Sequence, residues 1–397
     1  MKAISLALGT AALAALSLCP VSRAAAASGP TPGEVQHWGA YFGDSITGDG
    51  DSHGWPTGVS FPDPAPVVQV GTSNAAQYAL LGDGTVWAWG QGTNGELGDG
   101  TDLNSFTSPV QVQFPPGVQI SFLATDAMPY DTALAVDTSG NAWGWGLNQH
   151  GELCLGNTTA YTQPVQLPLA DVTTLAGASG HAVYDSGGTL FSCGSNFNGV
   201  LGDGARASST TAVPVTGLDG QDVTAVVSSF SNAGALLSSG AFYDWGYNAD
   251  GQLGDGQRGP GTSSHVPVQV MLPDPAPVTQ VAEGGSAVTN GQTLVMLADG
   301  TLYAWGSDTH AQLGDGRTTP QDAPVQIFPP AGVSYVALAS GGSTSYGLTA
   351  GGAVYAWGLG HNGQLGTGSK LTAKAPVQVP ASPASLISST ANDVVVS

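Results

Sequence analysis

The chain has 397 residues, of which 59 are glycine, and a formal net charge of −21 from 28 acidic and only 7 Lys and Arg residues. Binding to nucleic acid or to an anionic membrane surface needs clustered basic residues, so this charge balance excludes both. Hydrophobic residues still make up 41% of the chain, which excludes a disordered protein and indicates that the glycines serve turns in a packed β structure.

The N-terminal segment has the layout of a secretory signal. Lys2 precedes an apolar run over residues 3–18, and the small residues at 24–27 offer a cleavage site. We therefore expect a signal peptide over residues 1–27 and a linker over residues 28–33. The mature protein should be secreted, to the extracellular space, the periplasm or the cell surface. Retention as a membrane anchor and lipidation at Cys19 are the alternatives. No later apolar run reaches the length of a membrane span, so no membrane insertion of the mature chain is expected.

Residues 34–397 repeat one pattern seven times. The glycine that ends a W-G step, or its equivalent, recurs at spacings of 48 to 60 residues, at Gly39, Gly90, Gly146, Gly194, Gly246, Gly306 and Gly358. A Gly-containing turn such as residues 82–84 and a short alternating strand precede this glycine, and a Gly-rich loop such as GELGDG (95–100) and a P-V-x-V strand follow it. D-G and G-G turns between such strands predict tight hairpins, and no copy has a helical period.

Four short strands in each copy, repeated around an axis, predict an all-β fold consisting of a single seven-bladed β-propeller. The first copy, from residue 34, lacks the strands that precede W-G elsewhere. Residues 384–397 resemble those missing strands and then stop. We therefore expect the N- and C-terminal strands to join in one blade, which closes the ring and removes sheet edges.

The repeat, G-x-[VL]-[WY]-A-W-G followed by G-[QE]-L-G-D-G and P-V-x-V, resembles that of the regulator of chromosome condensation family over about residues 34–397. The resemblance implies a seven-bladed propeller. The eukaryotic founder is a nuclear exchange factor for the small GTPase Ran and binds chromatin through basic residues, whereas this chain is acidic and has no basic tail. It therefore resembles a bacterial-type secreted member. In architecture it is also similar to secreted propellers like the inhibitor of β-lactamases, which bind a protein on one rim.

Gly90, Gly92 and Gly95 form G-x-G-x-x-G directly after a predicted strand. A dinucleotide site also needs a helix after this loop, whose N-terminus holds the pyrophosphate, and an acidic residue about twenty positions further on. The following residues are rich in turns, and similar loops recur at residues 146–151, 246–251 and 358–363. We therefore interpret the motif as a structural loop and expect no cofactor.

Candidate metal and catalytic groups are scattered. The repeated loops offer one aspartate each (Asp99, Asp203, Asp255 and Asp315), which hydrogen bonds to nearby backbone N–H groups explain better than calcium. The richest loop, residues 43–54, lacks the distal bidentate Glu of a helix–loop–helix calcium site. Seven histidines are spread over different blades, and no G-x-S-x-G elbow is present. We expect no catalytic residues, no metal site and no enzymatic activity.

Two features depart from the repeat. Trp55 lies beside Pro56 in a predicted inserted loop over residues 52–64, where it is a candidate binding anchor; local packing of the loop is the alternative. Cys193 replaces the Trp of one W-G step, and Cys154 replaces the second loop glycine of the preceding copy. Adjacent blades and an oxidising compartment favour a disulfide, with two buried thiols as the alternative.

These observations predict a monomeric, non-enzymatic, secreted scaffold that binds a protein, or a cell-surface polymer, through loops on one rim. Extra residues gather in the segments 257–265 and 52–64, and insertions into the loops of a propeller are where recognition usually occurs. The contacting face of the partner should be neutral or basic. A regulator of a small GTPase with exchange-factor-like activity and an inhibitor of an extracellular enzyme are the alternatives.

Overall fold

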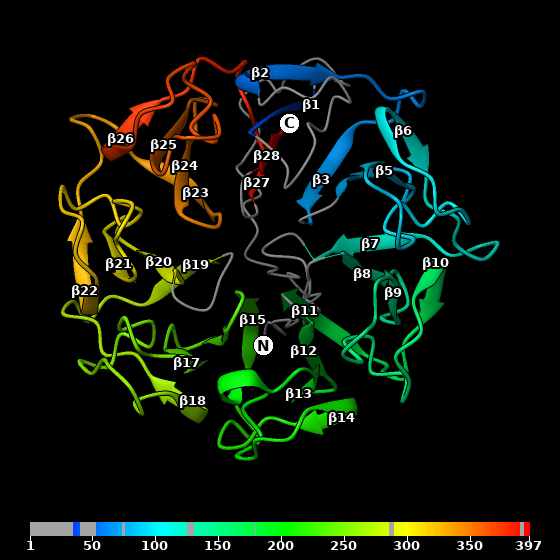
Figure 1. Cartoon of the computed structure of the whole chain (residues 1–397), viewed down its shortest axis with the longest axis horizontal. Coiled ribbons are helices and arrows are strands. Elements are labelled where there is room, and N and C mark those ends of the chain that lie inside the picture. The colour runs from blue at the N-terminus through cyan, green and yellow to red at the C-terminus, as the bar shows by residue number, and fades with distance from the viewer. Residues whose placement is uncertain are drawn as a thin grey trace, which may run out of the picture.

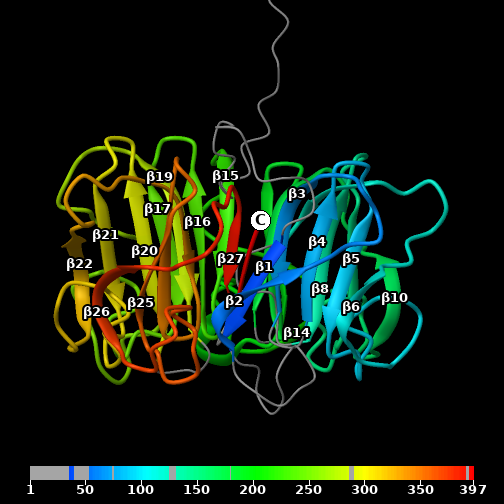
Figure 2. The ribbon, with the colours of Figure 1, turned by 90° about the horizontal axis from the view of Figure 1, so that it is seen from above.

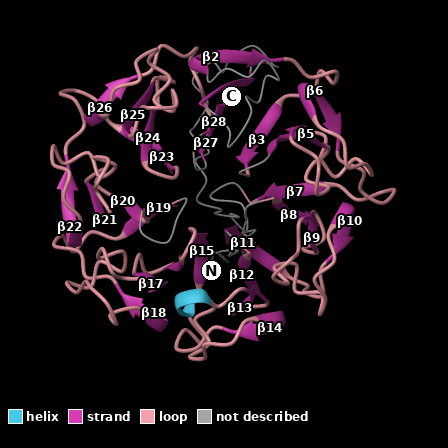
Figure 3. Cartoon of the chain, in the orientation of Figure 1, coloured by secondary structure: helices cyan, strands magenta, loops and turns pink. Residues whose placement is uncertain are grey.

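The structure is a computed structural model, and it describes residues 35–39, 53–73, 76–124, 131–178, 180–285, 290–389 and 393–397. The strands of these residues form seven four-stranded sheets, which are arranged as blades around a central axis (Figure 1). The only helix within the described ranges is one 3-10 turn, η1 (Phe197–Gly199) (Figure 3). The predicted all-β propeller with seven blades is therefore confirmed. The predicted signal peptide and linker, residues 1–33, lie outside the described residues.

Blades 1 to 3 each take four consecutive strands. Blade 1 contains β3 (Val67–Thr72), β4 (Ala76–Leu81), β5 (Val86–Gly90) and β6 (Ser105–Gln111). Blade 2 contains β7 (Ile120–Leu123), β8 (Thr132–Asp137), β9 (Ala142–Gly146) and β10 (Tyr161–Gln166). Blade 3 contains β11 (Val172–Ala178), β12 (His181–Ser186), β13 (Thr189–Gly194) and β14 (Ser209–Pro214).

Blades 4 to 6 follow the same order. Blade 4 contains β15 (Val223–Ser228), β16 (Asn232–Leu237), β17 (Phe242–Gly246) and β18 (Ser264–Gln269). Blade 5 contains β19 (Val278–Gly284), β20 (Gln292–Leu297), β21 (Leu302–Gly306) and β22 (Gln321–Ile327). Blade 6 contains β23 (Tyr335–Ser340), β24 (Thr344–Thr349), β25 (Val354–Gly358) and β26 (Ala373–Gln378).

The closing blade takes strands from both ends of the chain. Its order is β2 (His53–Val59), β1 (Val35–Gly39), β28 (Asp393–Val396) and β27 (Ile387–Ser389). β1 and β28 pair antiparallel, with Gln36 opposite Val396 and Gly39 opposite Asp393. The predicted ring closure is therefore confirmed, and the fold joins residues more than 350 positions apart in one sheet.

Large tryptophan side chains fill the spaces between blades. The W-G step ends the third strand of a blade, and in five blades its Trp packs against a described loop glycine of the preceding blade. A Cβ added to Gly254 of blade 4, for example, would lie 2.8 Å from Trp305 Nε1 of blade 5. The Trp305 indole N–H also donates a hydrogen bond to the Gln252 carbonyl, at 2.8 Å. The glycine is needed because it has no side chain and because its φ is +60°, which other residues rarely adopt. The interpretation of the W-G tryptophans as core between blades is confirmed.

Antiparallel pairing sorts the loops onto two faces, which lie at opposite ends of the strands in Figure 2. The loops between the first and second strands and between the third and fourth strands of each blade share one face, which we call the loop face. Gly180, between β11 and β12, lies against His150, between β9 and β10: a Cβ on Gly180 would be 2.5 Å from His150 Nδ1. The tight hairpins and the connections between blades lie on the opposite face, the hairpin face.

Candidate functional site

Trp55 lies in a strand and not in an inserted loop. It belongs to β2, the outer strand of the closing blade, so the loop predicted over residues 52–64 is wrong for residues 53–59. Pro56 follows it in the same register as Pro267 in β18, and an outer strand tolerates proline because one edge of it needs no ladder hydrogen bonds. The side chain of Trp55 is outside the described part. Val266, which occupies the same register position in β18, is 42% exposed.

Cys154 and Cys193 meet at the interface between blades 2 and 3. Their Cα atoms are 5.5 Å apart and their sulfur atoms 2.06 Å apart, which is a disulfide in this structure. Cys154 occupies the position of the loop glycine, with a φ of 57°, and Cys193 occupies the position of the tryptophan. The disulfide thus takes the place of the contact between glycine and tryptophan. At the interface between blades 1 and 2, Gly98 and Trp145 make that contact.

The loops between third and fourth strands share an internal framework. In four of them, a buried Asn or Asp side chain accepts a hydrogen bond from the backbone N–H of a leucine five residues later, as Asn196 does from Leu201 at 3.0 Å. Further along the loops of blades 1, 3, 4 and 5, an aspartate accepts a hydrogen bond from the N–H two residues later. These aspartates are Asp99, Asp203, Asp255 and Asp315, with distances of 2.8 to 3.0 Å. The structural explanation predicted for them is confirmed.

A further stabilising contact is present in five of the six described loops of this kind. A Glu or Gln side-chain oxygen accepts a hydrogen bond from the backbone N–H two residues before it, at 2.7 to 3.0 Å; these residues are Glu96, Glu152, Gln252, Gln312 and Gln364. Burial raises the pKa of Glu96 to about 7 and raises the pKa of Glu152 as well.

Blade 3 is the exception. Val200 stands at the position of the Glu or Gln, and a hydrocarbon side chain cannot accept this hydrogen bond. Asn198 takes a left-handed backbone with a φ of 62°, and Phe197 is 61% exposed. The conformation of this loop therefore differs from that of its five counterparts.

The adjacent loop in blade 4 is also unlike the others. It covers residues 247–263 and is three residues longer than each of the other five described loops between third and fourth strands. The segment 257–265 that the sequence singled out contains this insertion. Between the two exceptional loops lies a cavity of about 490 Å³, bordered by Phe197, Asn198 and Arg206 of blade 3 and by Ser263 and His265 of blade 4.

The side chains around this cavity are polar or aromatic. His265 packs over Gly199, where a Cβ would lie 2.2 Å from His265 Nδ1. Asn196 is buried, and its amide nitrogen donates to the backbone oxygens of Ala205 and Ala207, at 3.3 and 3.2 Å, which holds the loop that bears Arg206. None of the described residues that border the cavity carries a carboxylate.

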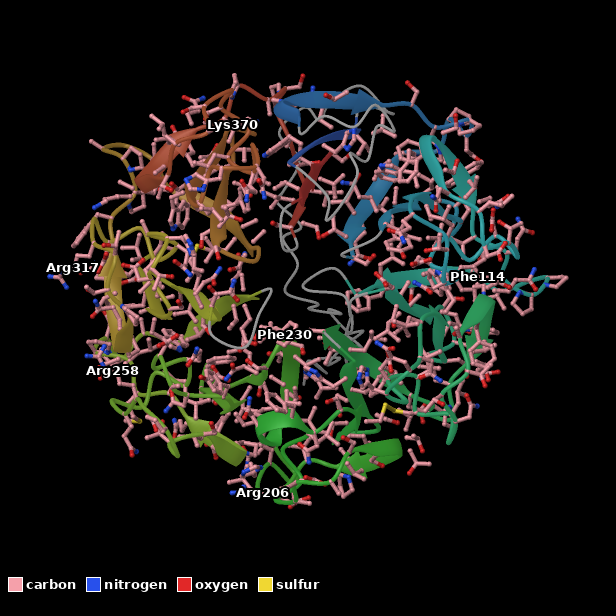
Figure 4. The ribbon with its side chains drawn as sticks, in the orientation of Figure 1. Phe114, Arg206, Phe230, Arg258, Arg317 and Lys370 are labelled. Atoms are coloured by element: carbon pink, nitrogen blue, oxygen red, sulfur yellow. A yellow bond between two sulfur atoms is a disulfide. The ribbon has the colours of Figure 1, made fainter. Side chains whose placement is uncertain are left out.

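The positive charges of the described chain gather along the same face. Four of the seven Lys and Arg residues lie one or two positions after G-D-G or G-T-G in the loops of consecutive blades: Arg206, Arg258, Arg317 and Lys370. Figure 4 shows them at the outer edge of the ring, from blade 3 round to blade 6. Lys374 follows at the start of β26. The sequence shows no cluster of basic residues, because the common position of these four appears only when the loops are aligned blade by blade.

Buried acidic groups form a second unusual cluster, between blades 4 and 5. Asp244 of β17 lies opposite Gly234 of β16, and a Cβ on Gly234 would be only 2.9 Å from Oε1 of Glu283 on β19. The Phe242 ring, which lies 2.5 Å from the same Cβ position, and the Glu283 side chain therefore share the space that this glycine leaves. Burial raises the pKa of Glu283 to about 8, and burial followed by the charge of Glu283 raises that of Asp244. The described residues contain no group of three or more His, Cys, Asp or Glu side chains placed to hold a metal ion.

The histidines occupy separate environments. His150, His310 and His361 lie in loop-face loops, with His310 and His361 in adjacent blades. His181 is buried between blades 3 and 4, where its Nε2 lies 2.7 Å from the Ser228 hydroxyl. Burial lowers the pKa of His181 to about 3, so the ring is neutral at physiological pH. No helix in the described ranges is long and apolar enough to cross a membrane.

Comparison with known proteins agrees with this architecture. Residues 83–123, 239–289, 299–348 and 351–392 match the regulator of chromosome condensation (RCC1) repeat, as do residues 335–364. Of the solved structures, that of Prp20p from Saccharomyces cerevisiae superposes with a TM-score of 0.79 at 21% identity, over 95% of this chain and 92% of Prp20p.

Two relatives illustrate different contexts for the repeat. The E3 ubiquitin-protein ligase HERC2 of Homo sapiens is 26% identical over 312 residues, which are 75% of this chain but 6% of HERC2. The Ultraviolet-B receptor UVR8 of Arabidopsis thaliana is 30% identical over 336 residues, which are 83% of this chain and 73% of UVR8. With this identity and coverage, and with seven blades built from the repeat, the chain belongs to the regulator of chromosome condensation (RCC1) repeat family.

Proposed function

We propose that this protein is a secreted, non-enzymatic scaffold that binds a partner protein through its loop face. The observation that carries the proposal is the distribution of differences between blades. The hydrogen-bonded strands repeat, whereas the altered loop of blade 3, the longer loop of blade 4 and the cavity between them all lie on the loop face. Loops on a rigid scaffold are where recognition residues are usually placed.

The family supports protein binding as the activity. Prp20p is described as binding Gsp1p and histones. A propeller suits this task because its blades support one another around the ring, so changes in the loops need not disturb the strands. Export rests on the signal-like segment before residue 28, and the 28 acidic residues suit a solvent-exposed secreted protein.

The test is affinity capture from the extracellular fraction of the producing organism, with the full-length secreted chain as bait. A loop-face variant, Phe197→Ala, should lose a specific partner, whereas a matched substitution of the exposed Phe328, beyond the end of β22, should retain it. Equal capture by both variants would contradict the assignment to the loop face. Trp55→Ala serves as a third bait, which tests the outer strand of the closing blade as a separate contact.

Salt provides a second measurement. Because the chain carries a charge of −21, we expect binding to a neutral or basic partner to weaken as the ionic strength rises. Affinity that is independent of salt would argue against a contribution from this charge.

Regulation of a small GTPase is the second candidate, favoured by membership of the family and by the binding of Prp20p to Gsp1p. The position of the mature N-terminus discriminates between the two candidates. Cleavage near residue 27 and recovery outside the cytoplasm would oppose a role with a cytoplasmic GTPase, whereas an uncleaved cytoplasmic chain that accelerates nucleotide release would favour it.

A further inference from the structure

Arg206 is unusual among the arginines of the loop face. Arg258 Nε lies 3.5 Å from an Asp322 oxygen, and one Arg317 nitrogen lies 3.8 Å from an Asp315 oxygen. Arg206 is exposed and has no ion pair or hydrogen bond to any described residue. In a chain with 28 acidic residues, an arginine without a carboxylate partner is a free cation at a defined position.

The cavity beside Arg206 offers additional groups for a ligand. The Asn198 side-chain nitrogen is buried, and the described part of the chain provides no acceptor for it. The exposed ring of Phe197 adds an apolar surface next to these polar groups. A guanidinium binds a carboxylate through two parallel hydrogen bonds, and an amide N–H can donate to the same group.

The two loops that form the cavity are those that depart from the repeat. Val200 cannot make the internal hydrogen bond that the other blades use, and Ser263 of the longer loop and His265 of β18 form the opposite wall. The G-D-G carboxylate nearest in sequence, Asp203, accepts hydrogen bonds from Ala205 N and the Asn196 amide, at 2.9 and 3.2 Å. It is thus engaged within its own loop.

We propose that this cavity binds an acidic side chain of the partner protein, with Arg206 pairing with the carboxylate and Phe197 contacting an apolar neighbour of that residue. The inference rests on the proposed function and specifies its chemistry. A partner whose overall surface is neutral or basic can present such a residue, because at about 0.15 M salt charges more than about 8 Å away are largely screened. The direct pair with Arg206 is screened much less.

The experiment uses the full-length chain and pools of immobilised pentapeptides. The pools are N-acetylated and tethered through the C-terminus, so they carry no free terminal carboxylate. Their central residue is Glu in one pool and Gln in the other, with the same random flanking residues. The variants are Arg206→Gln and its control Arg317→Gln, an exposed arginine in the equivalent loop of blade 5, together with Phe197→Ala and its control Phe328→Ala. Thermal melting of each variant verifies that it is folded.

We expect wild-type protein to prefer the Glu pool over the Gln pool by about tenfold, the size of effect typical of a hydrogen bond to a charged group. Arg206→Gln should abolish this preference, and Arg317→Gln should keep it. Phe197→Ala should weaken binding to the Glu pool about fivefold, whereas Phe328→Ala should have no effect.

Equal binding to the two pools, or a Glu preference that survives Arg206→Gln in a folded variant, would overturn the proposal. Soluble trigalacturonate serves as a second probe. If it binds with dependence on Arg206 while the peptides do not, the ligand is an acidic polysaccharide and the peptide assignment is wrong. Capture of a partner that Arg206→Gln does not weaken refutes the cavity site and leaves the proposed function standing. If Arg206→Gln abolishes the preference for the Glu pool but the affinity capture yields no partner protein, the result supports the site and counts against the proposed function.

Discussion

The interface between blades 2 and 3 and the interface between blades 4 and 5 solve the same packing problem in different ways. The first replaces both members of the repeated contact, glycine and tryptophan, with Cys154 and Cys193, which form a disulfide in the structure. The second keeps Gly254 against Trp305 and adds two buried carboxylates a short way along the strands. One interface is closed by a covalent bond, and the other carries an ionisable pair.

At both interfaces, residues that depart from the repeat occur in pairs whose members lie on neighbouring blades and complement each other. Glu283 fits because Gly234, on the neighbouring blade, has no side chain, whereas the residues equivalent to Gly234 in the other blades are Tyr, Leu or Val. Cys154 and Cys193 likewise make sense only together. A single substitution of either kind would leave a cavity or an overpacked core, both of which are destabilising.

Opening the ring should destabilise every non-covalent interface between blades and produce the largest effect. Deletion of residues 384–397 removes β27 and β28, so β1 keeps only β2 as a partner, and the closing blade loses the two inner strands that pack against β3 of blade 1 and β23 of blade 6. We expect loss of cooperative unfolding for the whole domain, measured by thermal denaturation followed by circular dichroism. A truncated protein that melts near the temperature of the full chain would contradict closure of the ring by both termini.

The covalent interface is tested by the double variant Cys154→Ser, Cys193→Ser. The bond closes a segment of 39 residues, and the chain-entropy relation gives a loss of about 4 kcal/mol in the free energy of unfolding. Urea denaturation measures this loss, and mass measurement after alkylation with and without reductant establishes the oxidation state of the wild type.

The matched control restores the repeat with Cys154→Gly and Cys193→Trp. This variant should recover a substantial part of the stability without any covalent bond. If the serine variant were as stable as the wild type, the disulfide would have no role in stabilising this interface.

The ionisable interface is tested by pH. An unfolded glutamate has a pKa of about 4.3, and burial raises that of Glu283 to about 8. The folded state thus binds its proton more tightly, and this stabilisation is complete below the unfolded pKa and is lost as the pH rises through about 8. Asp244 shifts in the same direction. The wild type should therefore lose stability between pH 5 and pH 8. In Glu283→Gln we expect this loss to be smaller by on the order of 2 to 3 kcal/mol.

Other groups also titrate in this range, since burial raises the pKa of Glu96 and Asp308 to about 7. The relevant measurement is therefore the difference in urea denaturation between variant and wild type at each pH. The double variant Asp244→Asn, Glu283→Gln should flatten the profile further than either single variant. A difference that does not change with pH would show that the pair is already ionised in the folded protein.

The interface between blades 2 and 3 replaces the contact between loop glycine and tryptophan, and the interface between blades 4 and 5 keeps it. Substitutions of two glycines test this contact. Gly254→Ala places a Cβ 2.8 Å from Trp305 Nε1, whereas Gly256→Ala meets nothing within 4 Å; their φ angles are +60° and +79°. Both substitutions strain the backbone by about 1 kcal/mol, and only the first should add an overpacking cost of about 1 to 2 kcal/mol. If both variants lose the same free energy of unfolding in urea denaturation, close packing against the tryptophan is not the reason that the glycine is required.

Much of the fold followed from local patterns. The W-G steps, the turns such as Asp83-Gly84 and the P-V-x-V strands predicted the blades, because alternation and turn chemistry act over a few residues. The strand containing Trp55 was missed because two glycines and a proline resemble a loop, whereas its register matches that of β18. The site was predicted only as far as the segment 257–265, since Phe197 and Arg206 stand out only against the aligned loops of other blades.

The sequence by itself determined the number of blades, most strands of the repeats and the closure of the ring, because each depends on a short pattern that recurs at a nearly constant interval. Tertiary structure decided which departures from the repeat meet. Glu283 enters the space beside Gly234, and Arg206 and His265 border one cavity, although each pair is about 50 to 60 residues apart in the chain. Such contacts depend on the packing of one blade against the next, and no pattern within a single repeat encodes that packing.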